Sequence, residues 1–387
     1  MKKIEKLIEE KILPHFDIDG DFVSISTPSS NGNINNTFVI NYINNGIVSS
    51  YVLQRINTTV FKNPFLVMEN IKNVTAHIKK KHPNEECLEV ISLKQKDFRD
   101  QDVMLIHENE YGETSYWRMY NCITNSISYD TSTNHEVFKK VGIAFANFHK
   151  DLSDFSMGEL NETIENFHNT RIRFLDLLSA IKTGIPERIL KSKPEIDYLC
   201  KHRHDYSIIT ELLEEEAIPY RVTHNDTKIN NVLMDKVTDE VKCVIDLDTI
   251  MPGSALYDIG DAIRSGASST SETEVDLSKV YLDLDLARAF LEGYLENMNG
   301  ELTKEEINNI PNSILVITLE LAMRFLTDYL LGDQYFKVPD DDKELNLKRC
   351  QNQIALAKDI ERKLPILTDI VKSINMKNKR ILKKEEI

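Results

Sequence analysis

Three residues in the segment 221–263 have the types and spacing needed for phosphoryl transfer. The segment reads RVTHNDTKINNVLMDKVTDEVKCVIDLDTIMPGSALYDIGDAI. Asn231 lies five positions after Asp226, and Asp246 follows fifteen positions after Asn231. The amide and carboxylate oxygens of Asn231 and Asp246 suit Mg²⁺, which keeps several waters and takes its remaining ligands from the phosphates of a nucleotide. The other carboxylate, Asp226, is then free to orient and deprotonate a hydroxyl group.

A β-hairpin is expected to hold two of these residues close together. The apolar runs 232–235 and 241–245 have near-equal length and flank a polar turn, which is the pattern of two paired strands. A register centred on this turn places Asn231 opposite Asp246, and Asp226 lies on the loop before the first strand. The hairpin therefore predicts a compact cluster of oxygen atoms at its open end.

Four further polar residues of this segment have less specific interpretations. His224 is interpreted as a hydrogen-bonding scaffold residue rather than a catalyst. Asp248 lies two positions after Asp246 and is a candidate second metal ligand or substrate ligand, a question that the spacing leaves open. Asp258 and Asp261 precede or open a helix, so they are interpreted as caps and structural anchors.

The secondary structure that must position these residues differs between the first and the second part of the chain. The first 120 or so residues alternate short strands with two helices, and Asn45-Gly46 between apolar runs is a strong hairpin signal. After Asn121 long helical patterns dominate, interrupted by the β-rich segment 222–250. The pattern predicts an α+β fold. Its first part contains helices over 2–13 and 64–80 and strands over 22–27, 37–42, 50–56, 103–106 and 116–120, and its later helices cover 137–152, 160–182, 194–215 and 276 onward.

Composition and absent motifs exclude several classes of protein. A net charge of -15 argues against a nucleic-acid binder. The five cysteines are far apart, which favours a reducing compartment over a disulfide scaffold. GxGxxG, the P-loop, GxSxG and HExxH are all missing. The N-terminus does not read as a signal peptide, and the apolar run 314–323 is too short to span a bilayer. We expect a cytoplasmic protein with no membrane partner.

The sequence also resembles a known family of kinases. The pattern HxDxxxxN over 224–231, followed by Ile245-Asp246, resembles the motifs of the aminoglycoside phosphotransferase and choline kinase superfamily, relatives of protein kinases. One branch, the N-acetylhexosamine 1-kinases, is similar over longer strings. These strings are THNDTKINNVLMD (223–235), CVIDLDTIMPG (243–253), AIRSGASS (262–269), TLELAMRFLTDYLLGDQYFK (318–337) and YWRMYNCI (116–123).

The resemblance implies a bilobal, protein-kinase-like architecture. Residues 1–121 would form a small β-rich, nucleotide-binding lobe, and residues 122–387 a larger, mostly helical lobe that carries catalysis and sugar binding. It assigns Asp226 as the catalytic base, which also contacts the substrate, and Asn231 and Asp246 as Mg²⁺ ligands.

The resemblance further implies where ATP would bind. The loop 28–36, including Asn33, would lie over the phosphates, although it lacks the GxG of protein kinases. Arg55 occupies the position of their phosphate-binding lysine. A guanidinium can fork onto phosphate oxygens, so the exchange is chemically sensible. Glu69 on the following helix is a candidate partner of Arg55.

The hinge and the sugar site complete the expected set of residues. Tyr120, Asn121 and Ile123 belong to the hinge whose backbone would hold adenine. In the kinases of this branch the sugar is contacted by an Arg and a Tyr, which match Arg324 and Tyr335.

The expected activity is transfer of the γ-phosphoryl group of ATP to O1 of N-acetylglucosamine or N-acetylgalactosamine, with Mg²⁺. The first alternative is the same machinery acting on choline, homoserine, an aminoglycoside or another sugar. An aminoglycoside needs an acidic pocket, and Arg324 disfavours such a polycation. The second alternative is a nucleotide-binding regulator without catalysis, against which the presence of Asp226, Asn231 and Asp246 argues. The oligomeric state is left open.

Overall fold

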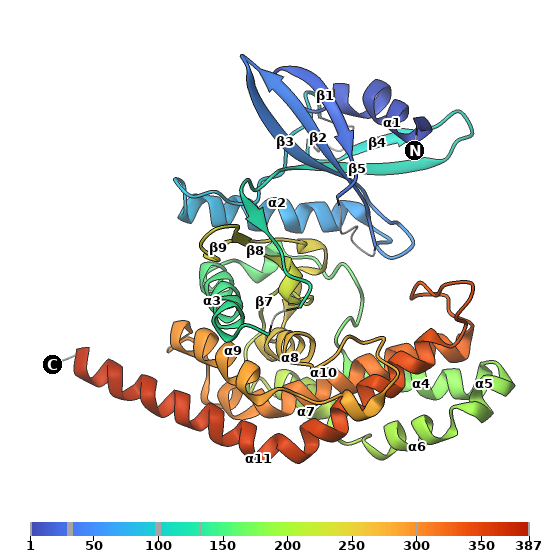
Figure 1. Cartoon of the computed structure of the whole chain (residues 1–387), viewed down its shortest axis with the longest axis vertical. Helices are drawn as coiled ribbons and strands as arrows, with labels where there is room; N and C mark the ends of the chain where they lie inside the picture. Colours follow the sequence, from blue (N-terminus) through green and yellow to red (C-terminus); the bar gives the residue numbers. More distant parts are fainter. Residues whose placement is uncertain (1, 29–33, 97–101, 132, 299, 386–387) are drawn as a thin grey trace.

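The N-terminal region is built on one antiparallel sheet. The computed structural model describes residues 2–28, 34–96, 102–131, 133–298 and 300–385. Five strands pair in the order β1-β2-β3-β5-β4 (Figure 1). At the β2–β3 turn Asn45 and Gly46 have φ values of 51° and 80°, which confirms the predicted hairpin. The strands are β1 (Asp21–Ser26), β2 (Asn36–Asn44), β3 (Ile47–Arg55), β4 (Leu105–Glu108) and β5 (Thr114–Asn121).

Helical segments cover both faces of this sheet. The N-terminal helix α1 (Lys2–Leu7) runs into a π-helical segment, Ile8–Ile12, whose buried residues pack with Trp117 of β5. On the other face lies α2 (Pro64–Lys81), which Figure 1 shows between the sheet and the rest of the chain. Its buried residues Met68 and Ile71 share a core cluster with Leu247. Thus α2 joins the sheet to the region that carries the chemistry.

The C-terminal region is mostly helical and packs around α10. The middle of this helix, 313–320, is buried on all sides, and the helix contributes many residues to the largest core cluster among the described residues. Its N-terminus begins with a capping box between Thr303 and Glu306. The helices are α3 (His135–Asp151), α4 (Thr170–Thr183), α5 (Pro186–Lys191), α6 (Lys193–Lys201), α7 (Ile208–Glu214), α8 (Ala255–Gly266), α9 (Leu284–Asn297), α10 (Lys304–Leu331) and α11 (Leu345–Glu385).

Two of the predicted helices are wrong in extent. The expected helix over 160–182 begins only at Thr170, because the side chain of Asn169 accepts a hydrogen bond from the backbone N–H of Ile172 and caps α4 there. The expected helix over 194–215 is two helices, α6 and α7, which are separated by a turn and a short 3₁₀ segment, Asp205–Ser207.

Two small sheets belong to the part of the chain after β5, and most of their strands interrupt the helices between α7 and α8. β7 (Arg221–Thr223) pairs with β10 (Met251–Gly253), and β8 (Val232–Asp235) pairs with β9 (Val241–Val244) and with β6 (Ser126–Ile127). The predicted hairpin exists, but its register differs by one residue. Val232 faces Val244, and Asn231 accepts a hydrogen bond from the backbone of Ile245 rather than facing Asp246. An irregularity between Leu233 and Met234 shifts the pairing.

The structure confirms the predicted α+β fold class, with a small sheet region followed by a larger helical region (Figure 1). β5 ends at Asn121, and the division into lobes at 121/122 stays a prediction. Among the helices of the described residues, none combines the length and the apolar character needed to cross a membrane.

Candidate active site

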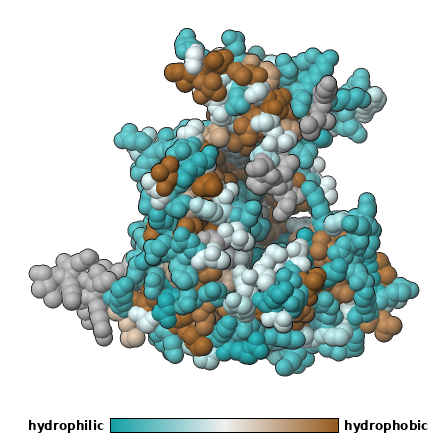
Figure 2. All heavy atoms as spheres, in the orientation of Figure 1, coloured by the Kyte–Doolittle hydropathy of each residue, from teal (hydrophilic) through white to brown (hydrophobic). Residues whose placement is uncertain are grey.

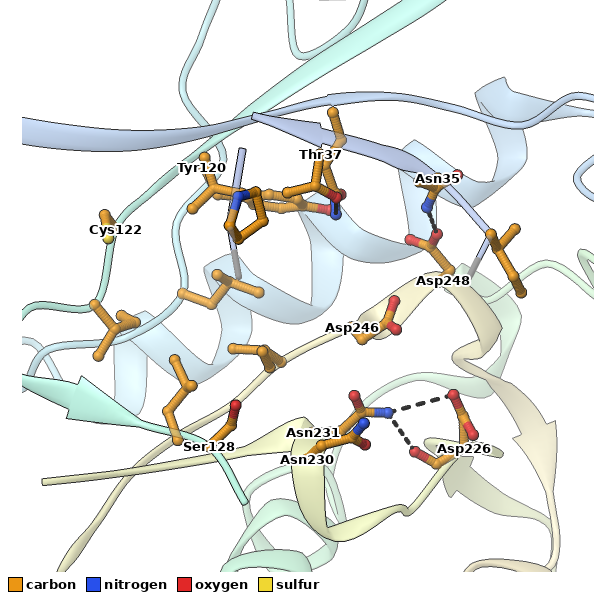
Figure 3. Close-up of a pocket in the computed structure, with 18 of the residues that line it drawn as sticks. Asn35, Thr37, Tyr120, Cys122, Ser128, Asp226, Asn230, Asn231, Asp246 and Asp248 are labelled. Atoms are coloured by element: carbon orange, nitrogen blue, oxygen red, sulfur yellow. Dashed lines mark hydrogen bonds between the residues drawn. The ribbon is translucent and has the colours of Figure 1, made fainter. Parts of the chain in front are cut away.

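A pocket of about 470 Å³ lies between the sheet and the loops around β8 and β9. In Figure 2 the surface is hollowed between these two regions. The sheet contributes Thr37 from β2 and Gln54 from β3. From the other side come Asp226, Asn231 and Asp246, which Figure 3 shows facing the same space. The structure therefore brings the three predicted catalytic and metal-binding residues together.

The loop that carries Asp226 is held by its backbone. The N–H groups of His224 and Asn225 each donate a hydrogen bond to the carboxylate of Asp258, both at 2.7 Å. Asn225 adopts a left-handed conformation, with φ of 63°, and Nε2 of His224 lies 2.8 Å from the carbonyl oxygen of Ile245. His224 and Asp258 thus act as the expected scaffold and anchor, although the cap of α8 is Ser254.

Asp226 is held in its charged form by its neighbours. Nζ of Lys228 lies 2.8 Å from Oδ1 of Asp226, and Nδ2 of Asn231 donates to the Asp226 carbonyl at 2.7 Å and to Oδ2 at 3.3 Å. Burial opposes ionisation, but Lys228, His224 and Asn231 together lower the pKa of Asp226. A carboxylate in this state can accept a hydrogen bond from a substrate hydroxyl.

The residues predicted as metal ligands present oxygen atoms to the pocket. Asp246 adopts a left-handed conformation with φ of 62°. The side chain of Asp246 faces the open pocket, and desolvation by the pocket walls, together with the carboxylates of Asp248 and Asp226, raises its pKa. Oδ1 of Asn230, which also lines the pocket, is buried without a hydrogen-bond partner in the described part of the chain. The pocket thus presents several carboxylate and amide oxygen atoms as metal ligands, which fits a hard divalent cation such as Mg²⁺.

Asp248 is committed to the sheet side of the pocket. Its Oδ2 accepts a hydrogen bond from Nδ2 of Asn35 at 2.6 Å (Figure 3). Its Oδ1 lies 2.5 Å from Nη2 of Arg118, and both side chains are buried. The sequence left open whether Asp248 is a metal ligand or a substrate ligand. The structure shows a third arrangement, in which Asp248 forms a buried ion pair with Arg118 of β5.

The predicted phosphate contact Arg55 and its candidate partner Glu69 are placed differently from the expectation. Arg55 does not line the pocket, whereas its neighbour Gln54 does, because successive side chains of a strand point to opposite faces. Arg55 and Glu69, both described, form no ion pair, and Glu69 accepts a hydrogen bond from Asn161. Asn33 lies outside the described residues.

The predicted hinge residues lie at the pocket wall. Tyr120, Asn121 and Ile123 all line it. The side chain of Asn121 donates to the carbonyl of Cys87 and accepts from the N–H of Glu89, both at 2.8 Å, so it braces the end of β5. The structure brings these three residues together as expected.

Arg324 and Tyr335 lie together, outside the lining of this pocket. Nη2 of Arg324 is 3.5 Å from the hydroxyl oxygen of Tyr335. The guanidinium lies over three rings, at 5.1 Å from the centroid of Phe167 and 5.7 Å from those of Tyr335 and Phe336. Arg324 also lies 3.9 Å from the buried carboxylate of Glu320.

A chain of contacts connects Arg324 to the loop that carries Asp226. Oε1 of Glu320 lies 3.0 Å from Nδ1 of His168, and Nε2 of His168 lies 3.4 Å from the carbonyl oxygen of Asn225, the residue before Asp226. Burial opposes a charged imidazole, but Glu320 raises the pKa of His168. We call Phe167, His168, Glu320, Arg324, Tyr335 and Phe336 the acceptor cluster.

Several of these residues were not predicted from the sequence. Lys228 had a local signal, because it lies two positions after Asp226 on the same loop. For Arg118 and Gln54 the sequence indicated only that they lie on predicted strands. No sequence pattern indicated His168 or Glu320, because helix α10 and the segment before α4 meet only in the tertiary fold.

Comparisons with known proteins show the family and the fold of the chain. Residues 27–294 match the model of the phosphotransferase enzyme family, APH. Among solved structures, the microcompartment-associated aminopropanol kinase has a TM-score of 0.61 at 16% identity, covering 94% of this chain and 98% of that chain. An ethanolamine kinase of Plasmodium vivax has a TM-score of 0.56 at 15% identity, covering 90% and 86%.

A third structure, the spectinomycin phosphotransferase APH(9)-Ia in complex with ADP and spectinomycin, has a TM-score of 0.52 at 13% identity, covering 94% of this chain and 98% of that chain. At such identities these likenesses show a common fold, which is the expected kinase-like one. The family model, in contrast, spans more than half of the chain. The protein therefore belongs to the phosphotransferase enzyme family.

Proposed function

We propose that this phosphotransferase is an ATP- and Mg²⁺-dependent kinase that phosphorylates O1 of N-acetylhexosamines. The observation that carries the proposal is the acceptor cluster. Arg324 and Tyr335, the residues that resemble a sugar-binding pair, are in contact, and Glu320 and His168 connect them to the residue before Asp226.

The charges of the acceptor cluster favour a neutral acceptor over a cation. Three aromatic rings within 6 Å of a positive charge are the arrangement that binds quaternary ammonium ligands. In this protein the guanidinium of Arg324 already occupies the place among the rings of Phe167, Tyr335 and Phe336. Arg324 can donate hydrogen bonds to a carbonyl or hydroxyl oxygen of a sugar. A choline-like or polyamine acceptor would meet like charge there.

The catalytic roles follow from the pocket's chemistry. Asp226 would accept a hydrogen bond, and finally the proton, from the anomeric hydroxyl as the bond from O1 to the γ-phosphorus forms and the bond from that phosphorus to the bridging oxygen of ADP breaks. Asn231 and Asp246 would hold Mg²⁺, which when bound neutralises charge on the phosphates. Lys228 would keep Asp226 ionised and oriented. Catalysis of this kind is mainly positioning and electrostatic stabilisation.

The test is ADP release by the purified protein with Mg²⁺ and ATP over a panel of acceptors. The panel contains N-acetylglucosamine, N-acetylgalactosamine, glucosamine, galactose, choline and kanamycin, and ³¹P NMR identifies any product. Turnover of the acetylated sugars to an anomeric phosphate is expected. Turnover of choline or kanamycin alone would keep the catalytic trio and overturn the acceptor assignment. Bound ATP with no turnover would favour the non-catalytic regulator.

A further inference from the structure

We propose that Arg118, on β5, is the cation that contacts the phosphates of the nucleotide. The position expected for this role is Arg55 on β3. The proposal rests on the nucleotide site of the proposed function, and it assigns that site a residue from a different strand.

The side chain of Arg118 forms part of the pocket wall. It lines the cavity together with Gln54 and Asp248, and only 1% of its surface is exposed. Arg55 is on the same sheet but does not line the cavity. In the register, Arg55 pairs with Trp117, whose ring belongs to the core on the opposite face, with Phe16 and Phe38. The pocket face of the sheet therefore receives its positive charge from β5.

The strand pairing explains how a cation on β5 can replace one on β3. Gln54 and Arg118 are direct partners in the β3–β5 register. Side chains of such partners start roughly 5 Å apart and lie on the same face. The β3 residue that faces the pocket is Gln54, which is neutral, and the positive charge is on its partner Arg118 on β5. The cation consequently reaches nearly the same place from the neighbouring strand.

The guanidinium is fixed in one orientation and keeps donors unused. Its Nε and Nη2 donate to Oε1 of Gln54 at 3.0 and 2.8 Å, and Nη2 pairs with Asp248 at 2.5 Å. Among the described residues, the one hydrogen-bond acceptor of Nη1 is Sδ of Met68 at 3.8 Å, and a thioether is a weak acceptor. A buried guanidinium whose Nη1 lacks an oxygen partner is suited to a phosphate oxygen.

Asp248 and Asn35 provide the support for this arrangement. Asp248 balances the charge of Arg118 on one side, and Asn35 holds the other carboxylate oxygen. Oδ1 of Asn35 in turn accepts a hydrogen bond from the N–H of Asn57 at 3.0 Å. Because these contacts already order the guanidinium, little side-chain entropy is lost when a phosphate binds.

The experiment compares nucleotide affinities of variants by calorimetry in the presence of Mg²⁺, with ATP, ADP and adenosine as probes. Arg118→Gln is expected to weaken ATP binding by about 10- to 100-fold, the range for one hydrogen bond to a charged group, and to leave adenosine binding unchanged. Arg118→Lys keeps the charge but loses the planar fork, so we expect a smaller loss. Arg55→Gln is expected to leave ATP affinity unchanged.

A double variant that exchanges the residues at positions 54 and 118 tests whether ATP affinity depends on the charge itself. The double variant Gln54→Arg/Arg118→Gln moves the guanidinium to β3 and is expected to recover part of the ATP affinity that Arg118→Gln loses. Thermal unfolding without nucleotide identifies any variant that has lost its fold. If Arg118→Gln does not fold, the ATP affinities of Arg118→Lys and Arg55→Gln are compared instead, and they decide which arginine contacts the phosphates.

Three outcomes would contradict the proposal. The first is wild-type ATP affinity in folded Arg118→Gln or Arg118→Lys, the second is an equal loss for adenosine, and the third is a loss confined to Arg55→Gln. In each of these the wild-type protein still binds Mg²⁺-ATP, so the proposed function stands. Failure of the wild-type protein to bind ATP at all would instead overturn the proposed function.

Discussion

The carboxylate of Asp258 holds the backbone of the catalytic loop at Asn225, with a distance of 2.7 Å from Oδ1 to the N–H nitrogen. Oδ2 accepts from the N–H of His224 at 2.7 Å and lies 2.9 Å from Nε2 of His149. Burial opposes the ionised form, but His149 and His224 lower the pKa of Asp258. A single buried carboxylate thus connects α8, α3 and the loop that ends in Asp226.

Replacing Asp258 should cost both stability and turnover. In Asp258→Asn one acceptor oxygen becomes an NH₂ group that faces N–H donors. We expect the free energy of unfolding in urea to fall by about 3 kcal/mol, as for a broken buried charged network, and kcat to fall with it. The same change at the exposed Asp340 is the control and should shift stability by less than about 0.5 kcal/mol. Equal effects at both positions would show that Asp258 is not an anchor.

Asp226 provides the direct test of catalysis. We expect Asp226→Ala to reduce turnover by at least about 10²- to 10⁴-fold, the contribution of a positioned base, while Mg²⁺-ATP still binds. Steady-state ADP release and calorimetry measure the two quantities separately. Turnover like that of the wild type in this variant would remove Asp226 from its role.

The pair of His168 and Glu320 should make stability depend on pH. The pKa of His168 is raised above 6.5 by Glu320, despite burial, so its contribution is complete below pH 6.5 and is lost as the pH rises through the raised value. The pKa of Glu320 is lowered from 4.5 by His168, Arg324 and Arg173, against the effect of burial. Its contribution is complete above pH 4.5 and is lost as the pH falls through the lowered value.

The variant Glu320→Gln removes this dependence. Urea unfolding over a pH series should show the wild type more stable than Glu320→Gln by about 3 kcal/mol between pH 4.5 and 6.5, the ordinary values of the two groups. The difference should shrink as the pH rises further. Besides Glu320, the charged groups facing His168 are Arg324 and Asp261, which the substitution leaves in place. A difference that does not change with pH would contradict the charge pair.

Arg324 should affect the acceptor without affecting the nucleotide. We expect Arg324→Gln to raise KM for the acetylated sugars by about 10-fold or more, since a hydrogen bond from a charged group contributes about 1.5–3 kcal/mol. KM for ATP should stay constant, because Arg324 does not line the pocket that contains Asp226 and Asp246. Initial rates with each substrate varied in turn make the comparison. A parallel rise in both constants would point to a general structural role.

Helices α3 and α9 lie so close together that Gly142 on α3 and Gly293 on α9 leave no room for a Cβ. A Cβ on Gly142 would lie 2.3 Å from the carbonyl oxygen of Phe290. We expect Gly142→Ala to lower the free energy of unfolding by about 1–3 kcal/mol, the cost of overpacking. At Gly158 a Cβ would meet its nearest neighbour only at 3.8 Å, so Gly158→Ala is the matched control. Urea denaturation that finds both changes neutral would mean that the helices can move apart at little cost.

The sequence by itself determined the local features of this protein. The strand–turn–strand pattern at Asn45-Gly46 predicts its hairpin because both residues tolerate positive φ, and the structure has it. The spacing of Asp226, Asn231 and Asp246 predicted a compact cluster of oxygen atoms, and all three residues line one pocket. They lie within 20 positions of each other on a single loop and hairpin, so their proximity depends on few long-range contacts.

Only the tertiary structure decided the features that depend on register and on distant segments. A shift of one residue reverses the face of every side chain on a strand, so the strand pairing, and not the sequence pattern, places Gln54 in the pocket and Arg55 outside it. The ion pair of Arg118 with Asp248 joins residues 130 positions apart. Glu320 and His168 meet across 152 positions. Such contacts form when distant surfaces pack to bury their apolar faces, which no local pattern specifies.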